Sequence, residues 1–384
     1  MKKSLVTLAI ISAVCGSAYA DDVTLYGRAD LGLVYTHIDT QIGNTSTKTD
    51  AFTMESGNGG SSRFGLTGNE NLGNGMKVNF VLENGFKADS GELSGGKEGR
   101  IFDREASIGL TGAYGTIRAG RMATILSDAG SMGYYAGAVN PFGTGWGTDI
   151  ASHANLFANQ IGVMDNVIGY ISPNLAGMTV YAQYGMGEQG VENKATANRY
   201  AALGVKYGVG ALELVGAVDW TNKKSVGQGA NYTLQDTKDA MTVNFGGSYD
   251  FGAIKTFVAT QYFKNASDVA SLAKLALDNQ FVTGPAELNR ADGYGIAFGA
   301  TLPVGPGTAL FSTGMMDGDM KNDVNKADLY AFSMSAAYTY SLSKRTTLYA
   351  AAGYIHKELE QKSKTLEVDT HQAAVGMIHT FEYR

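Results

Sequence analysis

Apolar and polar side chains alternate strictly over residues 330–342, "YAFSMSAAYTYSL". Successive side chains of a strand point to opposite faces, and one face here carries Tyr330, Phe332, Met334, Ala336, Tyr338 and Tyr340. Aromatic rings therefore lie at both ends of this face, which is where Tyr and Phe meet the two water interfaces of a bilayer. The ten steps from Tyr330 to Tyr340, at about 3.3 Å each and a tilt of about 45°, project to about 23 Å. The pattern predicts a membrane-spanning strand.

Segments with similar alternation recur along the whole chain and predict sixteen strands, an even number such as bacterial barrels have. We place these strands at residues 23–35, 61–68, 76–86, 101–111, 116–121, 165–172, 177–186, 199–207, 211–220, 239–249, 253–264, 291–302, 308–316, 328–340, 346–357 and 369–381.

The predicted connections alternate between short and long. Tight turns rich in Gly, Pro, Asn and Asp occupy residues 112–115, 173–177, 208–210, 250–252, 303–307 and 341–345. Longer polar loops occupy residues 36–60, 187–198, 221–238, 265–290 and 358–368. Short periplasmic turns and long outer loops are typical of outer-membrane barrels. The sequence therefore predicts an all-β fold, a sixteen-stranded antiparallel transmembrane β-barrel.

One connection, residues 122–164, has no convincing strand and is unusually long. It contains "YYAGAVNPFGTGWGTD", whose aromatic residues and glycines favour packing against a wall over exposure to solvent. We expect this loop to fold into the lumen. The alternative is a surface loop that contains one unrecognised hairpin.

The N-terminus, "MKKSLVTLAIISAVCGSAYADD", has the basic start, apolar run and Ala-Tyr-Ala ending of a secretory signal. We predict cleavage after Ala20, which divides the chain into a signal peptide (1–20) and a barrel domain (21–384). A lipoprotein acylated on Cys15 is the alternative, but Val14 stands where a small residue is expected. Removal of Lys2 and Lys3 would change the net charge from −6 to −8.

Composition narrows the class of protein further. Cys15 is the only cysteine, so the mature chain would contain no disulfide and no Cys-ligated metal. The negative charge argues against a nucleic-acid partner. No segment after the signal has the roughly 20 consecutive apolar residues of a transmembrane helix. A disordered glycine-rich chain is the alternative to a barrel with a wet lumen, and the 21 Tyr and 16 Phe argue against disorder.

Four blocks of sequence resemble the opening strands of Gram-negative general porins, especially those of beta-proteobacterial and neisserial type. They are "VTLYGRADLGL" (23–33), "SSRFGLTGNENLGNGMKVNFVLENGF" (61–86), "FDREASIGLTGAYGTIRAGR" (102–121) and "NVIGYISPNLAGMTVYAQYG" (166–185). The resemblance implies a homotrimer in the outer membrane, sixteen strands and a third loop folded inward. The chain departs from the family by lacking the Pro-Glu-Phe-Gly-Gly stretch of enteric porins in that loop. It also continues past Phe381 with Glu-Tyr-Arg, where such proteins typically end on Phe.

Alternation places several arginines inside the barrel. Leu25, Leu31 and Leu33 face outward on the first predicted strand, so that Arg28 and Asp30 face inward. By the same rule Arg63 faces inward on the second strand. Arg118 faces inward on the fifth strand, and we include it among the residues expected at the pore constriction.

Arg104 shares the parity of Phe102, Ala106, Ile108 and Leu110, which would form the apolar outer face. The resemblance instead implies that this arginine lies in the pore wall, with Ser107 and Gly109 packed at a subunit interface. Following the resemblance, we expect Arg28, Arg63 and Arg104 to face Asp128 and Asp149 of the long loop across a constriction, where a transverse field would orient solutes. The alternative is that all these groups are ordinary solvated lumen charges.

Arg121 has the outward parity of Ile117 and Ala119. A charge on the lipid face near the middle of the membrane costs about 2 to 4 kcal/mol, so Arg121 should lie near an interface or have a partner. The resemblance implies a partner in the second loop of a neighbouring subunit, where Glu92 and Glu98 are available. A plain interfacial arginine is an equal alternative.

The function that these patterns favour is a passive diffusion channel for small hydrophilic solutes and ions, weakly selective for anions, in contact with outer-membrane lipid. A solute-specific channel on the same barrel is the alternative. An enzyme is not expected, because no serine or aspartate is placed convincingly beside a histidine. A non-conducting adhesin would need a blocked lumen, which the small and charged inward residues do not suggest. We identify no catalytic, cofactor-binding or metal-binding residue.

Overall fold

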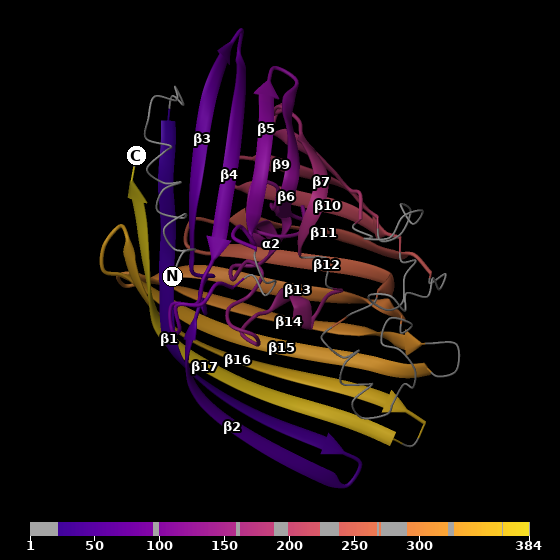
Figure 1. The fold of residues 1–384 in the computed structure, drawn as a ribbon. Coiled ribbons are helices and arrows are strands. Elements are labelled where there is room, and N and C mark those ends of the chain that lie inside the picture. The colour runs from indigo at the N-terminus through magenta and orange to yellow at the C-terminus, as the bar shows by residue number, and fades with distance from the viewer. Residues whose placement is uncertain are drawn as a thin grey trace.

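The computed structural model describes residues 22–94, 100–158, 162–187, 199–222, 238–266, 269, 290–321, 326–362 and 364–383. Its strands form one antiparallel sheet that closes into a barrel where β1 pairs with β17 (Figure 1). The strands are β1 (Asp22–Ile42), β2 (Thr45–Ser56), β3 (Arg63–Gly73), β4 (Met76–Gly85), β5 (Glu105–Gly112), β6 (Gly115–Ala123), β7 (Val163–Ile171), β8 (Met178–Gly185), β9 (Tyr200–Val209), β10 (Leu212–Thr221), β11 (Ala240–Asp250), β12 (Lys255–Ala266), β13 (Arg290–Val304), β14 (Gly307–Lys321), β15 (Lys326–Ser341), β16 (Thr346–Gln361) and β17 (Lys364–Tyr383).

In the described part of the chain, seventeen strand segments occupy sixteen positions around the barrel. β2 and β3 both pair with β1, since residues 45–56 pair with its second half and residues 63–69 with its first. Residues 57–62 separate β2 from β3, and these two segments together occupy one strand position in the barrel wall. The predicted sixteen-stranded antiparallel barrel is confirmed.

Two of the predicted loops are strands in the structure. Residues 36–60 contain the last third of β1 and all of β2, and residues 358–368 contain the hairpin between β16 and β17. These hairpins extend the barrel at the end opposite its short turns. Beyond the bilayer both faces of a hairpin meet water, so backbone pairing continues without the apolar alternation that revealed the other strands. The predicted loops 187–198, 221–238 and 265–290 lie largely outside the described residues.

The alternation of residues 330–340 is confirmed on β15. Met334 is 57% exposed on the outer face, whereas Ala331, Ser333 and Ser335 are buried on the inner face. The backbone N–H of Ala151, in the long connection, donates to Ser335 Oγ at 2.8 Å. The inner face of β15 is therefore covered by the chain's own interior segment.

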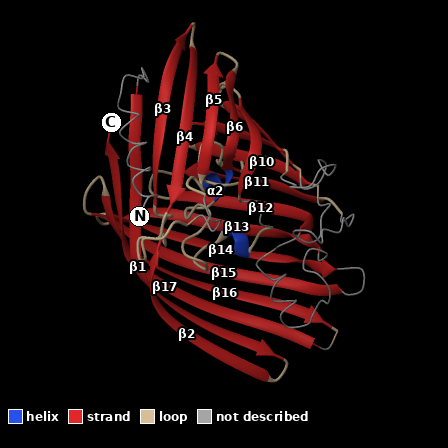
Figure 2. Ribbon diagram, in the orientation of Figure 1, coloured by secondary structure: helices blue, strands red, loops and turns tan. Residues whose placement is uncertain are grey.

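The connection between β6 and β7 packs against the inner wall. It contains the short helix α2 (Tyr135–Val139) and the 3₁₀ turn η1 (His153–Asn155), which Figure 2 shows in blue among the red strands. The Tyr135 hydroxyl donates to the carbonyl oxygens of Phe245 and Thr260, both at 3.2 Å. Among residues 122–158 and 162–164 the structure has no additional strand hairpin, so the alternative of an unrecognised one is not supported there.

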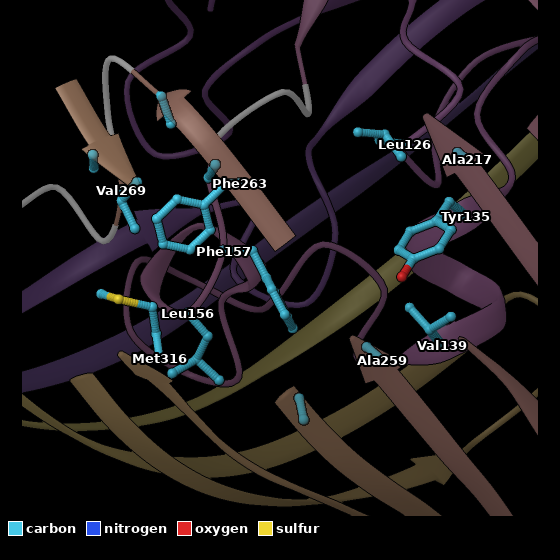
Figure 3. Close-up of a cluster of buried hydrophobic side chains, with 14 of the residues drawn as sticks. Leu126, Tyr135, Val139, Leu156, Phe157, Ala217, Ala259, Phe263, Val269 and Met316 are labelled. Atoms are coloured by element: carbon cyan, nitrogen blue, oxygen red, sulfur yellow. The ribbon is translucent and has the colours of Figure 1, made fainter. Parts of the chain in front are cut away.

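A buried apolar cluster fixes this connection in place (Figure 3). Phe157 of the connection is 2% exposed, and the cluster brings it together with Phe263 of β12 and Met316 of β14. Full burial of such a side chain contributes about 1.5 to 3 kcal/mol, so the cluster makes the connection part of the folded core. No helix within the described residues is long and apolar enough to cross a membrane.

The two ends of the described chain lie at the short-turn end of the barrel. β17 continues beyond Phe381, and Tyr383 pairs with Leu25 at the beginning of β1. The connections between β5 and β6, β9 and β10, and β13 and β14 are at this same end. Because short turns are periplasmic in outer-membrane barrels, this is the periplasmic end.

Candidate functional site

Arg28, Arg63, Arg104 and Asp128 line one cavity of about 750 Å³ inside the barrel. Residues 140–147 of the long connection form another side of this cavity, and Lys255 of β12 also lines it. Four of the six residues predicted for a constriction are thus brought together. We call this cavity the outer chamber, and Arg28, Arg63 and Arg104 the arginine cluster.

The arginines reach the outer chamber in two ways. Arg28 of β1 and Arg63 of β3 are directly paired across the two strands, and both face inward as alternation predicted. Arg104 lies one residue before β5 begins, so the pleat of that strand does not determine its direction. Its guanidinium turns inward to Glu83.

The side of β5 that faces inward differs from the prediction. Glu105, Ser107 and Gly109 are buried, whereas Ile108 is 58% exposed on the outer face. The expectation that Ser107 and Gly109 pack against a neighbouring subunit is therefore wrong. Arg104 lines the pore because it precedes the strand, and this leaves the apolar residues of β5 free to face the membrane.

Glu83 of β4 is a member of the site that the sequence reasoning missed. Its carboxylate lies 3.3 Å from Arg63 Nε and 2.7 Å from Arg104 Nε, and it accepts the Tyr26 hydroxyl at 2.9 Å. Two arginines consequently share one carboxylate. Glu83 lies opposite Gly65 in the pairing of β3 with β4, and Gly65 is two residues from Arg63 on the same strand. This register is the signal that could have identified Glu83 from the sequence.

Asp30 holds residues 57–60 against the arginine cluster. Its buried carboxylate accepts the N–H groups of Gly59 at 2.7 Å and Gly60 at 2.8 Å, and the Tyr349 hydroxyl at 2.8 Å. The Arg28 guanidinium lies so close to Gly60 that a Cβ would collide with it. The interruption between β2 and β3 therefore packs directly on Arg28.

The two predicted acids of the long connection separate in the structure. Asp128 lines the outer chamber and accepts the Thr144 N–H at 3.1 Å. Gly143, with φ +60°, leaves no room for a side chain against that carboxylate. Asp149 does not line the chamber. It accepts the Thr148 hydroxyl at 2.8 Å, and its own N–H donates to Gln372 of β17.

Arg118 faces inward on β6 as predicted but lies in a buried network outside the outer chamber. It donates to Ser107 Oγ at 2.8 Å and to Asn79 Oδ1, and its guanidinium is 3.7 Å from Glu105. Glu105, which is 1% exposed, also accepts the N–H and the hydroxyl of Ser131. This network ties β5 and β6 to the beginning of the long connection.

Arg121 has an acidic partner within its own chain. Its guanidinium lies 2.6 Å from Asp165, which also pairs with Arg100 at 2.8 Å. The pairing of β6 with β7 shifts register between Gly120 and Met122, whereas the pairing with β5 places Arg121 opposite Ala106, which keeps the outward parity predicted from the sequence. Glu92 is paired with Lys87 at 3.4 Å, and Glu98 lies outside the described residues. Contacts of these residues with another subunit stay a prediction.

Two histidines have aspartate neighbours that the sequence did not predict: His37 lies 2.8 Å from Asp50, and His356 lies 3.0 Å from Asp369. His153 is 3% exposed, with its ring packed against Phe157 and Tyr135. Burial lowers the pKa of His153 to about 3, so this histidine is neutral at physiological pH. The residues that the structure describes include no group of three or more His, Cys, Asp or Glu side chains that could hold a metal ion.

Comparisons with known proteins agree with this architecture. Residues 7–358 match the Gram-negative porin family. The chain is 30% identical to an outer membrane porin protein of Bordetella pertussis, over 92% of this chain and 94% of that protein. It is 27% identical to the major outer membrane protein P.IB of Neisseria meningitidis serogroup B, over 99% of this chain and 100% of that protein.

Solved structures show the same fold. The anion-selective porin from Comamonas acidovorans superposes with a TM-score of 0.66 at 21% sequence identity, over 94% of this chain and 99% of that one. OmpF of Salmonella typhi superposes with a TM-score of 0.59 at 16% identity, over 94% and 97% of the two chains. With a family match over most of its length and a closed barrel around a charged interior, the chain belongs to the Gram-negative porin family.

Proposed function

We propose that this outer-membrane barrel is a passive diffusion pore for small hydrophilic solutes and ions, with a weak preference for anions. The observation that carries the proposal is the charge of the outer chamber. Its charged lining residues are Arg28, Arg63, Arg104, Lys255 and Asp128, which are four cations and one carboxylate. Fixed charges act most strongly on ions where a path is narrow, because free solution screens them within about 10 Å at 0.1 M salt.

Ion pairs reduce the excess of positive charge in the outer chamber but do not change its sign. Glu83 is shared by Arg63 and Arg104, which leaves one net positive charge among the three groups. Among the described residues, neither Arg28 nor Lys255 has a carboxylate within ion-pair distance. The negative net charge of the whole chain is a separate quantity, because a permeating ion responds to the charges beside its path.

The reversal potential of the purified protein in a planar bilayer, measured across a potassium chloride gradient, tests the proposed preference. Its sign should correspond to chloride permeating more readily than potassium. A cation preference would contradict the proposal and would indicate that acidic groups dominate the path. The solute-specific alternative is tested by adding candidate solutes, since a specific channel would show saturable block of single-channel current.

We further propose that the mature protein begins at Asp21 and assembles as a homotrimer. Small outward side chains support close packing between copies, as in other membrane interfaces. They gather on β15 to β17 as Ala336, Ala350, Ala352 and Ala373, in a shallow apolar hollow that Leu33 of β1 also lines. Mass spectrometry should find residues 1–20 absent, and cross-linking in mild detergent should give trimers. A retained leader would contradict the first proposal, and monomers alone the second.

A further inference from the structure

Arg28 and Asp30 lie two residues apart on β1 and share the inner face of that strand. Their side chains begin about 7 Å apart along the strand, which an arginine side chain can span. In the described part of the chain the two groups nevertheless form no ion pair. Such a pair would cancel the charge of Arg28, which is the member of the arginine cluster that Glu83 does not contact. What keeps Asp30 from pairing therefore matters for the outer chamber.

The carboxylate of Asp30 is occupied by other donors. Its Oδ2 accepts the N–H groups of Gly59 at 2.7 Å and Gly60 at 2.8 Å, and its Oδ1 accepts the Tyr349 hydroxyl at 2.8 Å. Hydrogen bonds to an ionised acceptor are stronger than those between neutral groups. Both oxygens of Asp30 thus have partners that compete with Arg28.

Tyr349 belongs to β16 and reaches Asp30 across two strands. Gly376 of β17 lies directly opposite Tyr349, and it also lies directly opposite Gly32 of β1. A Cβ on either glycine would collide with the Tyr349 hydroxyl. The tyrosine side chain therefore lies over these two glycines, across the seam where the barrel closes, and the wall itself determines where its hydroxyl is.

Tyr349 also contacts the long interior connection. Its ring centroid lies 5.6 Å from that of Trp146, in an edge-to-face arrangement. The N–H of the next residue, Gly147, donates to the carbonyl oxygen of Asn58 at 2.7 Å. Residues 57–60 and the long connection are thus joined to each other beside Tyr349.

Residues 57–60 touch Arg28 as well as Asp30. The Arg28 guanidinium packs on Gly60, while the preceding Gly59 binds Asp30. Arg28 is also directly paired with Arg63 on β3, and like charges at paired positions repel one another. The structure therefore holds Arg28 beside a second cation and gives its neighbouring carboxylate other partners.

We propose that Tyr349 is a positioning residue for ion selectivity, whose hydroxyl keeps Asp30 from neutralising Arg28. The inference rests on the proposed function as an anion-preferring pore. Tyr349 is uncharged and does not line the outer chamber, so it acts on permeating ions through the two charged groups. Without the hydroxyl, Oδ1 of the buried Asp30 loses its partner, which is costly, and the guanidinium two residues away can replace that partner.

Tyr349→Phe tests the inference without changing the net charge. The reversal potential across a potassium chloride gradient gives the permeability ratio of chloride to potassium. This ratio should fall toward the value of Arg28→Gln without passing it, most clearly at low salt, where screening is least. Tyr170→Phe is the matched control, because it removes a hydroxyl that donates to the Tyr114 carbonyl oxygen at 2.8 Å, away from the outer chamber. It should leave the ratio unchanged.

The double variant Arg28→Gln, Tyr349→Phe separates positioning from a structural role. It should have the same permeability ratio as Arg28→Gln alone, because no guanidinium remains at residue 28 for Asp30 to neutralise. A merely structural role would lower the midpoint of thermal unfolding and leave the ratio unchanged in Tyr349→Phe. An unchanged ratio in Tyr349→Phe would overturn the inference, and so would a further fall in the double variant.

Asp30→Asn supplies a second measurement if Tyr349→Phe does not insert. The asparagine keeps an oxygen for the N–H groups of Gly59 and Gly60, and its amide can donate to the Tyr349 hydroxyl oxygen. Only the negative charge is lost, so the permeability ratio should rise above that of the unmodified protein. An unchanged or lower ratio would contradict the inference. Absence of conduction, or cation preference, in the unmodified protein refutes the proposed function, whereas equal ratios in the unmodified protein and Tyr349→Phe refute this inference alone.

Discussion

Ser131 donates its hydroxyl hydrogen to Glu105 at 2.6 Å, and so joins the long interior connection to the first residue of β5. The Ser131 N–H donates to the other oxygen of the same carboxylate at 2.9 Å. Asp128, which lines the outer chamber, lies three residues away. The position of Asp128 opposite the arginine cluster therefore depends on the buried carboxylate of Glu105.

Ser131→Ala should make the pore noisier without changing its ion selectivity. The variant loses one hydrogen bond to a charged group, worth about 1.5 to 3 kcal/mol, but keeps the backbone bond. Residues 128–131 should then fluctuate more, and open-channel current noise should increase severalfold. Ser333→Ala, which removes a hydroxyl from the buried inner wall of β15, is the control. Equal noise in the two variants would show that the Glu105 contact does not hold the connection.

Neutralising the arginine cluster should move the reversal potential toward that of a cation-selective pore. Arg28→Gln alone should produce a larger shift than Arg104→Gln, because Glu83 already offsets Arg104. The shift should be greatest at low salt, where screening is least. Lys344→Gln, on the short turn before β16, changes the same net charge away from the path and should leave the potential unchanged. If the triple variant Arg28→Gln, Arg63→Gln and Arg104→Gln conducts with unmodified selectivity, the cluster does not control permeation.

Glu83→Gln should increase the anion preference. The substitution removes the carboxylate that Arg63 and Arg104 share. The two guanidinium groups would then keep a neutral hydrogen-bond acceptor but lose the negative charge that offsets them. Loss of one partner from a buried ion pair is also destabilising, by about 3 to 5 kcal/mol, and a lower midpoint of thermal unfolding should accompany the change. Reversal potential and thermal unfolding are measured on the same preparation. Glu360→Gln, at an exposed position on β16 away from the outer chamber, should alter neither, and a decreased anion preference in Glu83→Gln would contradict the charge assignment.

Acid should loosen the interior connection through His153. Because the folded pKa of about 3 lies below the unfolded value of about 6.5, the unfolded state binds more protons between these limits. The contribution of neutral His153 to stability is therefore complete above about pH 6.5 and is lost as the pH falls toward 3. Fluorescence of Trp146, in a Trp220→Phe background, should report exposure of the connection in this window. His153→Leu cannot titrate and should move the change to lower pH, whereas an identical acid transition would assign it to other groups.

Much of the barrel could be predicted because the bilayer dictates its pattern. A strand with an apolar outer face and a water-facing inner face has an alternating sequence that can be recognised, as on β15. The short turns between such strands can be recognised by their turn residues. Most of β2 was missed because it extends into water on both faces, where residues 45–51 are exposed and no apolar stripe is required. The need for an apolar outer face, which makes strands recognisable in the sequence, ends where the chain leaves the membrane.

The site was less predictable because its residues depart from simple alternation. Arg104 lies before its strand, so parity alone misdirects it. Arg121 keeps its predicted parity, but its partner Asp165 lies across a register shift that the sequence does not reveal. Glu83 was missed because its role depends on which arginines lie across the neighbouring strands. Asp128 and Asp149 look alike in sequence, but only the folded path of the connection decides that one meets the arginines and the other meets Gln372.

The pairing of β1 with β17 also constrains the order of events during folding. The first strand must wait for a partner more than three hundred residues later, so the barrel cannot close until β17 has been made. Contacts this distant in sequence make folding slow, and an open sheet exposes unpaired edges that other chains can join. This protein therefore has to remain unassembled throughout its synthesis and export. Residues of β17 around Phe381, which pair with β1, are the ones that finish the wall.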